Sequence, residues 1–160
     1  MAIEYPFAAS VDRVFALLSD PDFLVDRCLA LGEISAECSV EDDGKQLVIA
    51  LTREVERALP SFLARLFESL QTIEVVERWK QSKGKIYHGS LLIKVIGQPI
   101  TVEAEMRLKP DSTTGCTYAV AHTAKANMPL IGRRVEAFML TQIESGARAE
   151  LDYLAKALRR

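Results

Sequence analysis

The sequence predicts an α+β fold in which a curved antiparallel sheet of about seven strands wraps around a long C-terminal helix. Three observations lead to this prediction. Apolar and polar residues alternate in consecutive segments joined by short turns, which indicates antiparallel strands. Two helix starts follow the first predicted strand. Near the C-terminus, apolar positions recur at steps of three and four, which indicates one long helix.

Two short helices are expected directly after the first strand, "IEYPFA". Ser10 is a good N-cap for a helix that runs to about Leu18. The pair Asp20–Pro21 combines a capping residue with a proline suited to the first helical position, so a second helix begins there. Gly32 ends that helix.

Six further strands are expected before the C-terminal helix. The first alternates from Ile34 to Val40, and the pair Asp43–Gly44 is a strong signal for a tight hairpin. The next strand ends near Val55. The other four are expected at about 73–79, 87–95, 100–108 and 116–125.

The segment "RALPSFLARLFESLQ", residues 57–71, separates the third and fourth strands and is too apolar for an ordinary hairpin tip. Pro60 suits the start of a short helix. The apolar side chains of the segment lie at helical spacing: Phe62, Leu63, Leu66, Phe67 and Leu70.

The C-terminal helix is expected from about Pro129 to Leu158, a length on the order of 40 Å at 1.5 Å per residue. Only this element is long enough to cover the buried face of the sheet. Arg133 and Arg134 fall in its first turn, where cations oppose the helix dipole, so they either hold an anion or are solvated surface residues.

Composition and charge favour a single domain over residues 1–160. Apolar residues make up 49% of the chain, and the net charge of −2 gives no reason to expect a nucleic-acid partner. The N-terminus lacks the basic region of a signal peptide, and no apolar run approaches the roughly 20 residues of a membrane-spanning helix. We therefore expect a cytoplasmic protein without a transmembrane segment.

Strong catalytic and metal-binding motifs are absent from the sequence. The three cysteines, Cys28, Cys38 and Cys116, are far apart and form no CxxC pair, so we expect neither a disulfide framework nor a zinc site. Cys38 and Cys116 fall on apolar faces and are expected to be small buried hydrophobes, with a catalytic thiolate as the alternative. There is no Ser-His-Asp spacing, no glycine-rich phosphate loop and no HExxH motif. We expect no cofactor and no bound metal.

Three stretches carry a resemblance to a known fold: "YPFAASVDRVFALLSDPDF", "GEISAECSV" and "NMPLIGRRVEAFM". Together with the order of elements they resemble the helix-grip fold of the START-like superfamily, which includes plant pathogenesis-related allergens, polyketide cyclases and lipid-transfer domains. The resemblance covers essentially the whole chain. It is closest to a bacterial branch of unknown function, and it is more specific for fold than for function.

The resemblance implies a cavity between the sheet and the long helix that takes apolar small molecules. Arg53 and Glu77 both continue inward-facing apolar positions. If Val55 opposes Val75 on the neighbouring strand, Arg53 opposes Glu77. The pair then either anchors a ligand's head group or forms a structural ion pair, unless the charges simply reach solvent.

Other candidate residues share the inward face. His122 is either a ligand contact or general base, or a core histidine. Tyr87 and Tyr118 either present hydroxyls to the cavity or pack. The apolar helix of residues 57–71 is expected to be a lid over the cavity mouth, a fixed cap on the core, or a docking patch. The candidate ligand-binding residues are Arg53, Phe62, Leu66, Phe67, Glu77, Trp79, Tyr87, Tyr118, His122 and Phe138.

The leading hypothesis is a non-enzymatic binder of an apolar or amphipathic small molecule such as a lipid or polyketide, acting as a monomer or weak dimer. A cyclase-type enzyme that uses the same cavity is the alternative. A protein-interaction module whose cavity is filled by side chains is a second alternative.

Overall fold

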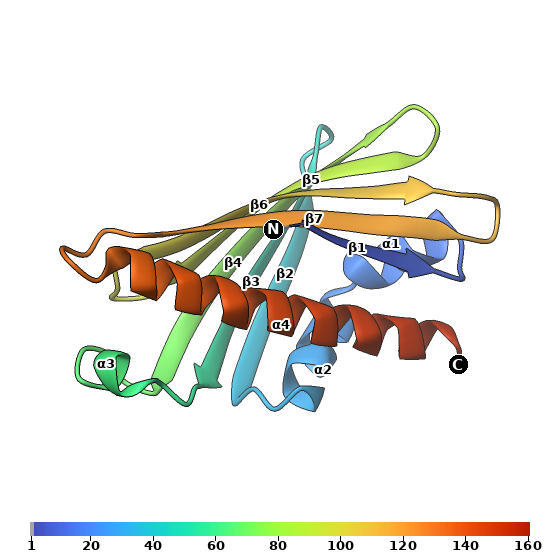
Figure 1. Ribbon diagram of the computed structural model, residues 1–160. Coiled ribbons are helices and arrows are strands. Elements are labelled where there is room, and N and C mark those ends of the chain that lie inside the picture. The colour runs from blue at the N-terminus through green and yellow to red at the C-terminus, as the bar shows by residue number, and fades with distance from the viewer. Residues whose placement is uncertain (1) are drawn as a thin grey trace.

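The computed structural model describes residues 2–160 and contains one seven-stranded antiparallel sheet whose concave face is covered by a long helix (Figure 1). The elements follow in the order β1 (Ala2–Phe7), α1 (Val11–Leu18), α2 (Pro21–Ala30), β2 (Ser35–Asp42), β3 (Leu47–Glu56), α3 (Ser61–Ala64), β4 (Leu70–Ser82), β5 (Ile86–Val95), β6 (Ile100–Pro110), β7 (Cys116–Ala126) and α4 (Gly132–Leu158). The predicted α+β helix-grip class is confirmed.

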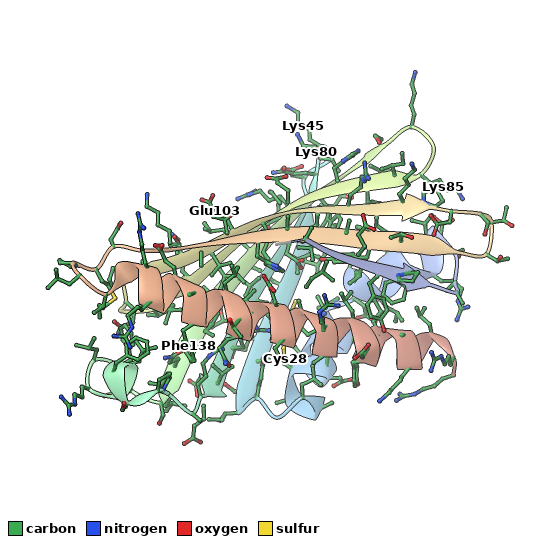
Figure 2. All side chains as sticks on the ribbon, in the orientation of Figure 1. Cys28, Lys45, Lys80, Lys85, Glu103 and Phe138 are labelled. Carbon is green, nitrogen blue, oxygen red and sulfur yellow. The ribbon has the colours of Figure 1, made fainter. Side chains whose placement is uncertain are left out.

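The sheet order is β1-β7-β6-β5-β4-β3-β2, so six consecutive strands form a meander and the first strand pairs with the last. Helix α4 crosses the concave face and contacts β7 and β1, while α2 packs on β2 at the other edge. The outer face of the sheet is polar: Figure 2 shows Lys80 and Glu103 pointing away from α4, as does Lys45 in the β2–β3 turn. None of the helices in the described part of the chain combines the length and apolarity that crossing a membrane requires.

The starts that the sequence predicts for the two short helices are present, whereas the long helix starts at Gly132, three residues after the expected Pro129. The hydroxyl of Ser10 accepts a hydrogen bond from the backbone N–H of Arg13 at 3.3 Å. The carboxylate of Asp20 accepts from the N–H of Asp22 at 3.0 Å, and Pro21 occupies the first helical position. Gly32, just beyond α2, has a φ of +94°, a left-handed conformation that glycine adopts without steric cost.

The segment of residues 57–71 contains a single helical turn, α3, and it packs against the N-terminal part of α4. The buried side chains Leu63 and Phe67 join a cluster that includes Val135 of α4. The guanidinium of Arg134 lies 3.9 Å from the centre of the Phe62 ring. Leu66 points away and is 50% exposed. In this structure the segment caps one end of the core.

The predicted pairing of Arg53 with Glu77 is wrong. Arg53 is paired with Ile73, and Glu77 is paired with Ile49 on one side and Leu91 on the other. The cause is the length of α3, which takes up only residues 61–64 of the loop. Strand β4 therefore begins at Leu70, three residues before the expected start, and the register of the whole hairpin shifts.

Helix α4 is anchored to the sheet at both of its ends. Val135 and Met139 pack with the α3 segment near the N-terminus of the helix. Leu151 and Leu154 pack into the large cluster formed with α1, β1 and the ends of several strands. Between these anchors only Ile143 of α4 is fully buried. The helix therefore packs closely on the sheet at its two ends and less closely over the middle of the sheet.

Candidate ligand-binding cavity

A cavity of about 390 Å³ lies beneath the middle of α4, within the range of roughly 300–1,000 Å³ typical of small-molecule sites. Its apolar floor comes from inward-facing residues of β3 to β7, because successive side chains of a strand alternate between the two faces. These floor residues are Leu51, Val55, Val75, Leu91, Ile93, Met106 and Val120.

The cavity exists because the part of α4 above it carries small side chains. Ser145, Gly146, Ala147 and Ala149 all line the space. A methyl group added at Gly146 would meet no atom within 4 Å. The anchored ends prevent the helix from sinking to fill the gap, so the void remains.

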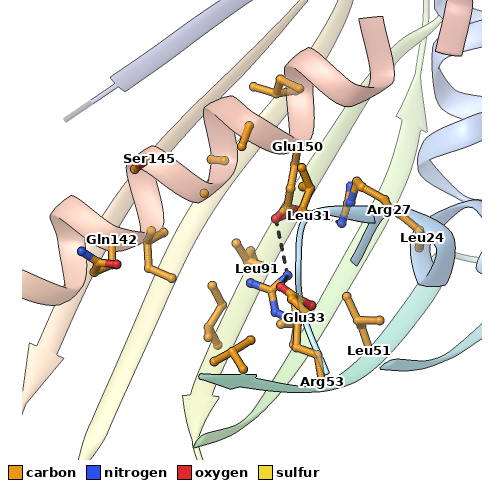
Figure 3. A pocket seen from close by; sticks show the side chains of 18 of the residues that line it. Leu24, Arg27, Leu31, Glu33, Leu51, Arg53, Leu91, Gln142, Ser145 and Glu150 are labelled. Carbon is orange, nitrogen blue, oxygen red and sulfur yellow. Dashed lines mark hydrogen bonds and ion pairs between the residues drawn. The ribbon is translucent and has the colours of Figure 1, made fainter. Parts of the chain in front are cut away.

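The cavity opens to solvent between the α2–β2 loop, the end of β3 and α4. Residues at this mouth line the cavity and are exposed or half-buried: Leu31, Gly32, Glu56, Arg57, Gln142 and Ser145. Figure 3 shows Leu31 on one side of the space and Gln142 and Ser145 on the helix at the other side. A small molecule could therefore enter without unfolding either anchor of α4.

Four charged side chains form an ion cluster on one wall of the cavity (Figure 3). Glu150 of α4 lies between two guanidiniums: its Oε2 is 2.9 Å from Nη2 of Arg27, and its Oε1 is 3.4 Å from Nη1 of Arg53. The same Nη1 atom of Arg53 is 3.3 Å from Oε1 of Glu33. The cluster ties α4 to α2 and β3 across the cavity.

Opposite charges keep this cluster ionised. Burial alone would raise the pKa of Glu150, but Arg27 and Arg53 outweigh it and hold that pKa below its usual range. Burial alone would likewise lower the pKa of Arg53, but Glu150 and Glu33 outweigh it and raise that pKa. The cluster therefore places fixed charges beside an apolar floor.

Glu77 lines the same cavity but forms no ion pair within residues 2–160. Burial raises its pKa to about 7, although nearby Arg27 favours the charged form. Burial, and then the charge of Glu77, raise the pKa of the neighbouring Tyr118, which therefore stays protonated. A carboxyl group with a pKa close to neutral pH can both donate and accept a proton.

Glu77 and His122 occupy one row across the sheet, in which Glu77 pairs with Leu91, Leu91 with Ala104, and Ala104 with His122. Three strand spacings separate the ends of this row, about 14 Å along the sheet. His122 is 5% exposed, and burial lowers its pKa, so the ring is neutral near pH 7. Its Nδ1 atom is buried without a hydrogen-bond partner in the described chain.

The cavity brings together four of the ten residues that the sequence nominates: Arg53, Glu77, Tyr118 and His122. The other six lie outside it. Trp79 and Tyr87 pack around Phe15, with the rings of Phe15 and Tyr87 stacked at 3.8 Å between centroids. The remaining four belong to the core at the α3 end or its surface: Phe62, Leu66, Phe67 and Phe138. Their roles as ligand contacts stay predictions.

Sequence reasoning missed five charged residues of the cavity: Arg27, Glu33, Glu56, Arg57 and Glu150. Two of them carried a readable signal. Arg27 follows the buried Leu24 by three positions on α2, and Glu150 precedes the buried Leu154 by four on α4. A charge within the apolar stripe of a helix indicates a buried ion pair or a cavity.

Metal binding has no support in this region. Within residues 2–160, no three His, Cys, Asp or Glu side chains gather as a metal ion would require. The three cysteines are free; Cys28 is buried beside the ion cluster, where burial raises its thiol pKa to about 12. A thiol with that pKa is a poor nucleophile at neutral pH.

Comparison with protein families identifies the chain. The model of the family described as "Protein of unknown function (DUF2505)" matches residues 2–158. The chain belongs to this family. A search of curated proteins found no match.

Solved structures with the same fold are distant in sequence. A START superfamily protein from Mycobacterium smegmatis has a TM-score of 0.58 at 12% identity, covering 98% of this chain and 97% of that one. Norcoclaurine synthase from Thalictrum flavum has a TM-score of 0.57 at 14% identity, covering 100% and 86%. The di-domain ARO/CYC BexL of the BE-7585A biosynthetic pathway reaches 0.61 at 13% identity, covering 99% and 46%.

These similarities establish the fold, and the expected START-like resemblance is confirmed. They do not assign a ligand or a reaction, because one fold supports many functions. The charged cavity of this chain is therefore the basis for a functional proposal.

Proposed function

We propose that this protein binds an amphipathic small molecule in the cavity beneath α4 and does not transform it. The observation that carries this proposal is the cavity beneath the middle of α4. Because α4 is anchored at both ends and carries small residues between them, it leaves a cavity of about 390 Å³ with an apolar floor and a charged wall. Such a lining suits a ligand with an apolar body and a polar end.

The fold comparisons are consistent with this proposal. Norcoclaurine synthase and the ARO/CYC BexL, which share the fold, are named for small-molecule chemistry. The partner we propose is a lipid- or polyketide-like molecule, bound in the cytoplasm by a monomer or a weak dimer. A protein-interaction module with a filled cavity is disfavoured, because side chains do not fill the space.

The experiment is to block the cavity and measure binding. Ala147→Phe places a ring in the space beneath α4, whereas Ala137→Phe changes an exposed position of the same helix outside the cavity lining. Native mass spectrometry after purification without detergent reports retained ligand, and calorimetric titration with 1-decanol reports new binding. We expect both signals for the wild type and for Ala137→Phe, and neither for folded Ala147→Phe. Equal binding by Ala147→Phe would show that the cavity is not the site.

A cyclase-type enzyme is the second candidate, and Glu77 is the observation that favours it. A carboxyl group with a pKa of about 7 faces the same apolar floor as the neutral His122, so the cavity contains two groups able to move protons. Cyclisation of a polyketide requires proton removal next to a carbonyl group, which such groups can perform.

This candidate is tested with 2-decanone in D₂O, where exchange of the protons beside the carbonyl is followed by NMR. Exchange faster than in buffer, lost in Glu77→Gln while 2-decanone still binds, would establish proton transfer in the cavity. Exchange at the buffer rate with bound ketone would leave simple binding as the function.

A further inference from the structure

Of the three arginines that line the cavity, Arg57 is the one that forms no ion pair within the described residues. It lies just beyond β3, with the same strand alternation as the inward-facing Arg53 and Val55, and it lines the cavity mouth. Among residues 2–160 it forms no ion pair, and its Nε atom is buried without a hydrogen-bond partner. A half-buried guanidinium is rarely left in this state, since desolvation is costly.

The surroundings of Arg57 make this lack of a partner significant. Burial, and then repulsion from Arg53, lower the pKa of Arg57, while the more weakly acting Glu33 favours its charged form. The carboxylate of Glu33 is already bound to Arg53 at 3.3 Å. Glu56 is the other carboxylate at the mouth, and it is exposed to solvent. Arg27, Arg53 and Arg57 together carry one more charge than the two carboxylates paired in the ion cluster, Glu33 and Glu150.

The opposite side of the mouth offers polar groups rather than charges. Gln142 and Ser145 of α4 line the opening, and Figure 3 draws both on the helix side of the space. An amide and a hydroxyl can donate hydrogen bonds to an anion held by Arg57. The apolar floor of the cavity includes Val55 and Ile93. The site therefore combines polar groups at its mouth with an apolar floor.

We propose that Arg57 binds the anionic head group of an amphipathic ligand whose apolar chain lies on the cavity floor. This inference rests on the proposed binding function and specifies its ligand class. The planar guanidinium presents paired N–H donors that match the two oxygens of a carboxylate and also those of a phosphate. The ligand's charge supplies the partner that the folded chain does not provide for Arg57.

The test compares ligands that differ only in their head groups: decanoate, decyl phosphate and 1-decanol. Trp79 is the one tryptophan of the chain, and its ring centroid is 6.4 Å from that of the cavity-lining Tyr118, so tryptophan fluorescence reports binding. Titrations use full-length wild type, Arg57→Gln and the control Arg148→Gln, which removes an exposed arginine of α4 outside the lining.

We expect Arg57→Gln to weaken decanoate and decyl phosphate binding roughly tenfold to a hundredfold, because a hydrogen bond to a charged group is worth about that much. Its affinity for 1-decanol should change less than about twofold, and Arg148→Gln should change none of the three. The anion that binds more tightly to the wild type identifies the head group as carboxylate or phosphate. Added NaCl should weaken binding of the anions and spare the alcohol.

Two results would overturn the inference, and they are distinguishable. If 1-decanol binds, and decanoate and decyl phosphate bind Arg57→Gln as tightly as the wild type, the cavity is a binding site but Arg57 does not bind the head group. If none of the three ligands binds the wild type, the proposed function fails and the anchor fails with it. Should Arg57→Gln not fold, the salt dependence of wild-type binding and the variant Arg57→Lys decide the question.

Discussion

The closed end of the molecule and its hollow middle lie on the same face of the same sheet, yet only one of them is filled. We call the packing around Phe15, Trp79 and Tyr87 the closed end. There Trp79 is 2% exposed, and the rings of Phe15 and Tyr87 are stacked at 3.8 Å. In the middle, α4 presents Gly146 and Ala147 to a void. The size of a few side chains, on a shared backbone plan, decides whether this fold forms a core or a site.

The two regions also differ in how they are held together. The closed end depends on apolar contact, and its indole ring lies directly on Gly89 of the neighbouring strand. The middle depends on the ion cluster, in which Glu150 joins Arg27 and Arg53 across the cavity. Dispersion and burial dominate in the first region, and electrostatics in the second.

The largest loss of stability is expected when the ring of Trp79 is removed from the closed end. Trp79→Ala should lower the free energy of unfolding by about 3–5 kcal/mol, because it removes a fully buried ring from tight packing. Leu91→Ala, on the cavity floor, should cost less, about 1–2 kcal/mol, since that side chain already borders a void. Urea denaturation followed by circular dichroism measures both. Equal losses would mean that the cavity is filled in solution.

The sequence was sufficient to predict the fold. Alternation of period two locates the strands, and the caps at Ser10 and Asp20 locate the helix starts, because both are local signals. The register of β3 and β4 was not predictable in the same way. It depends on how many residues the turn α3 takes up, and that number is set by the packing of Leu63 and Phe67 on α4.

The candidate site was only partly predictable. Arg53, Glu77, Tyr118 and His122, which strand parity turns inward, line the cavity, and their roles as ligand contacts stay predictions. Parity does not distinguish the closed end from the hollow middle, so Trp79 and Tyr87 were predicted to line a cavity that they do not reach. What separates them is Phe15 of α1, which packs on Trp79 and Tyr87 and is a long-range contact with no signal in the strand itself.

The second largest effect is expected in the ion cluster. Glu150→Gln should destabilise the protein by about 2–3 kcal/mol at pH 7, because it leaves Arg27 and Arg53 buried with less opposing charge. The wild-type pKa of Glu150 is depressed, so its contribution is present above the ordinary glutamate pKa and lost as the pH falls below it. Denaturation curves from pH 3 to pH 7 measure this dependence, with the exposed Glu103→Gln as control. A loss at pH 7 no larger than that of the control would exclude a structural role for the cluster.

A smaller pH dependence of stability, opposite in sign to that of Glu150, is expected from Glu77. Its pKa is raised from 4.5 to about 7, so the folded state holds a proton that the unfolded state releases between those values. Stability should therefore fall as the pH rises from about 4.5 to 7, and Glu77→Gln should remove this dependence.

At pH 8, Glu77→Gln should raise the free energy of unfolding by about 1–2 kcal/mol. This value is smaller than the full pKa shift would give, because the carboxyl group faces a cavity that water can enter. At pH 4 the variant and the wild type should be equally stable. Thermal denaturation at the two pH values separates this expectation from a general packing effect, which would appear at both. A variant that is less stable at pH 8 would show that charged Glu77 has a stabilising partner.

The smallest expected effect compares one substitution in both regions. Gly146→Ala should raise the free energy of unfolding by about 0.5–1 kcal/mol, because alanine favours the helix and its methyl group meets no atom within 4 Å. Gly89→Ala should lower it by about 1–2 kcal/mol, because the added carbon would lie 2.8 Å from the ring of Trp79. The same methyl group thus stabilises where the fold is hollow and destabilises where it is full. Urea denaturation of both variants gives the two signs, and a destabilising Gly146→Ala would mean that α4 moves closer to the sheet in solution and that the void is smaller than the structure indicates.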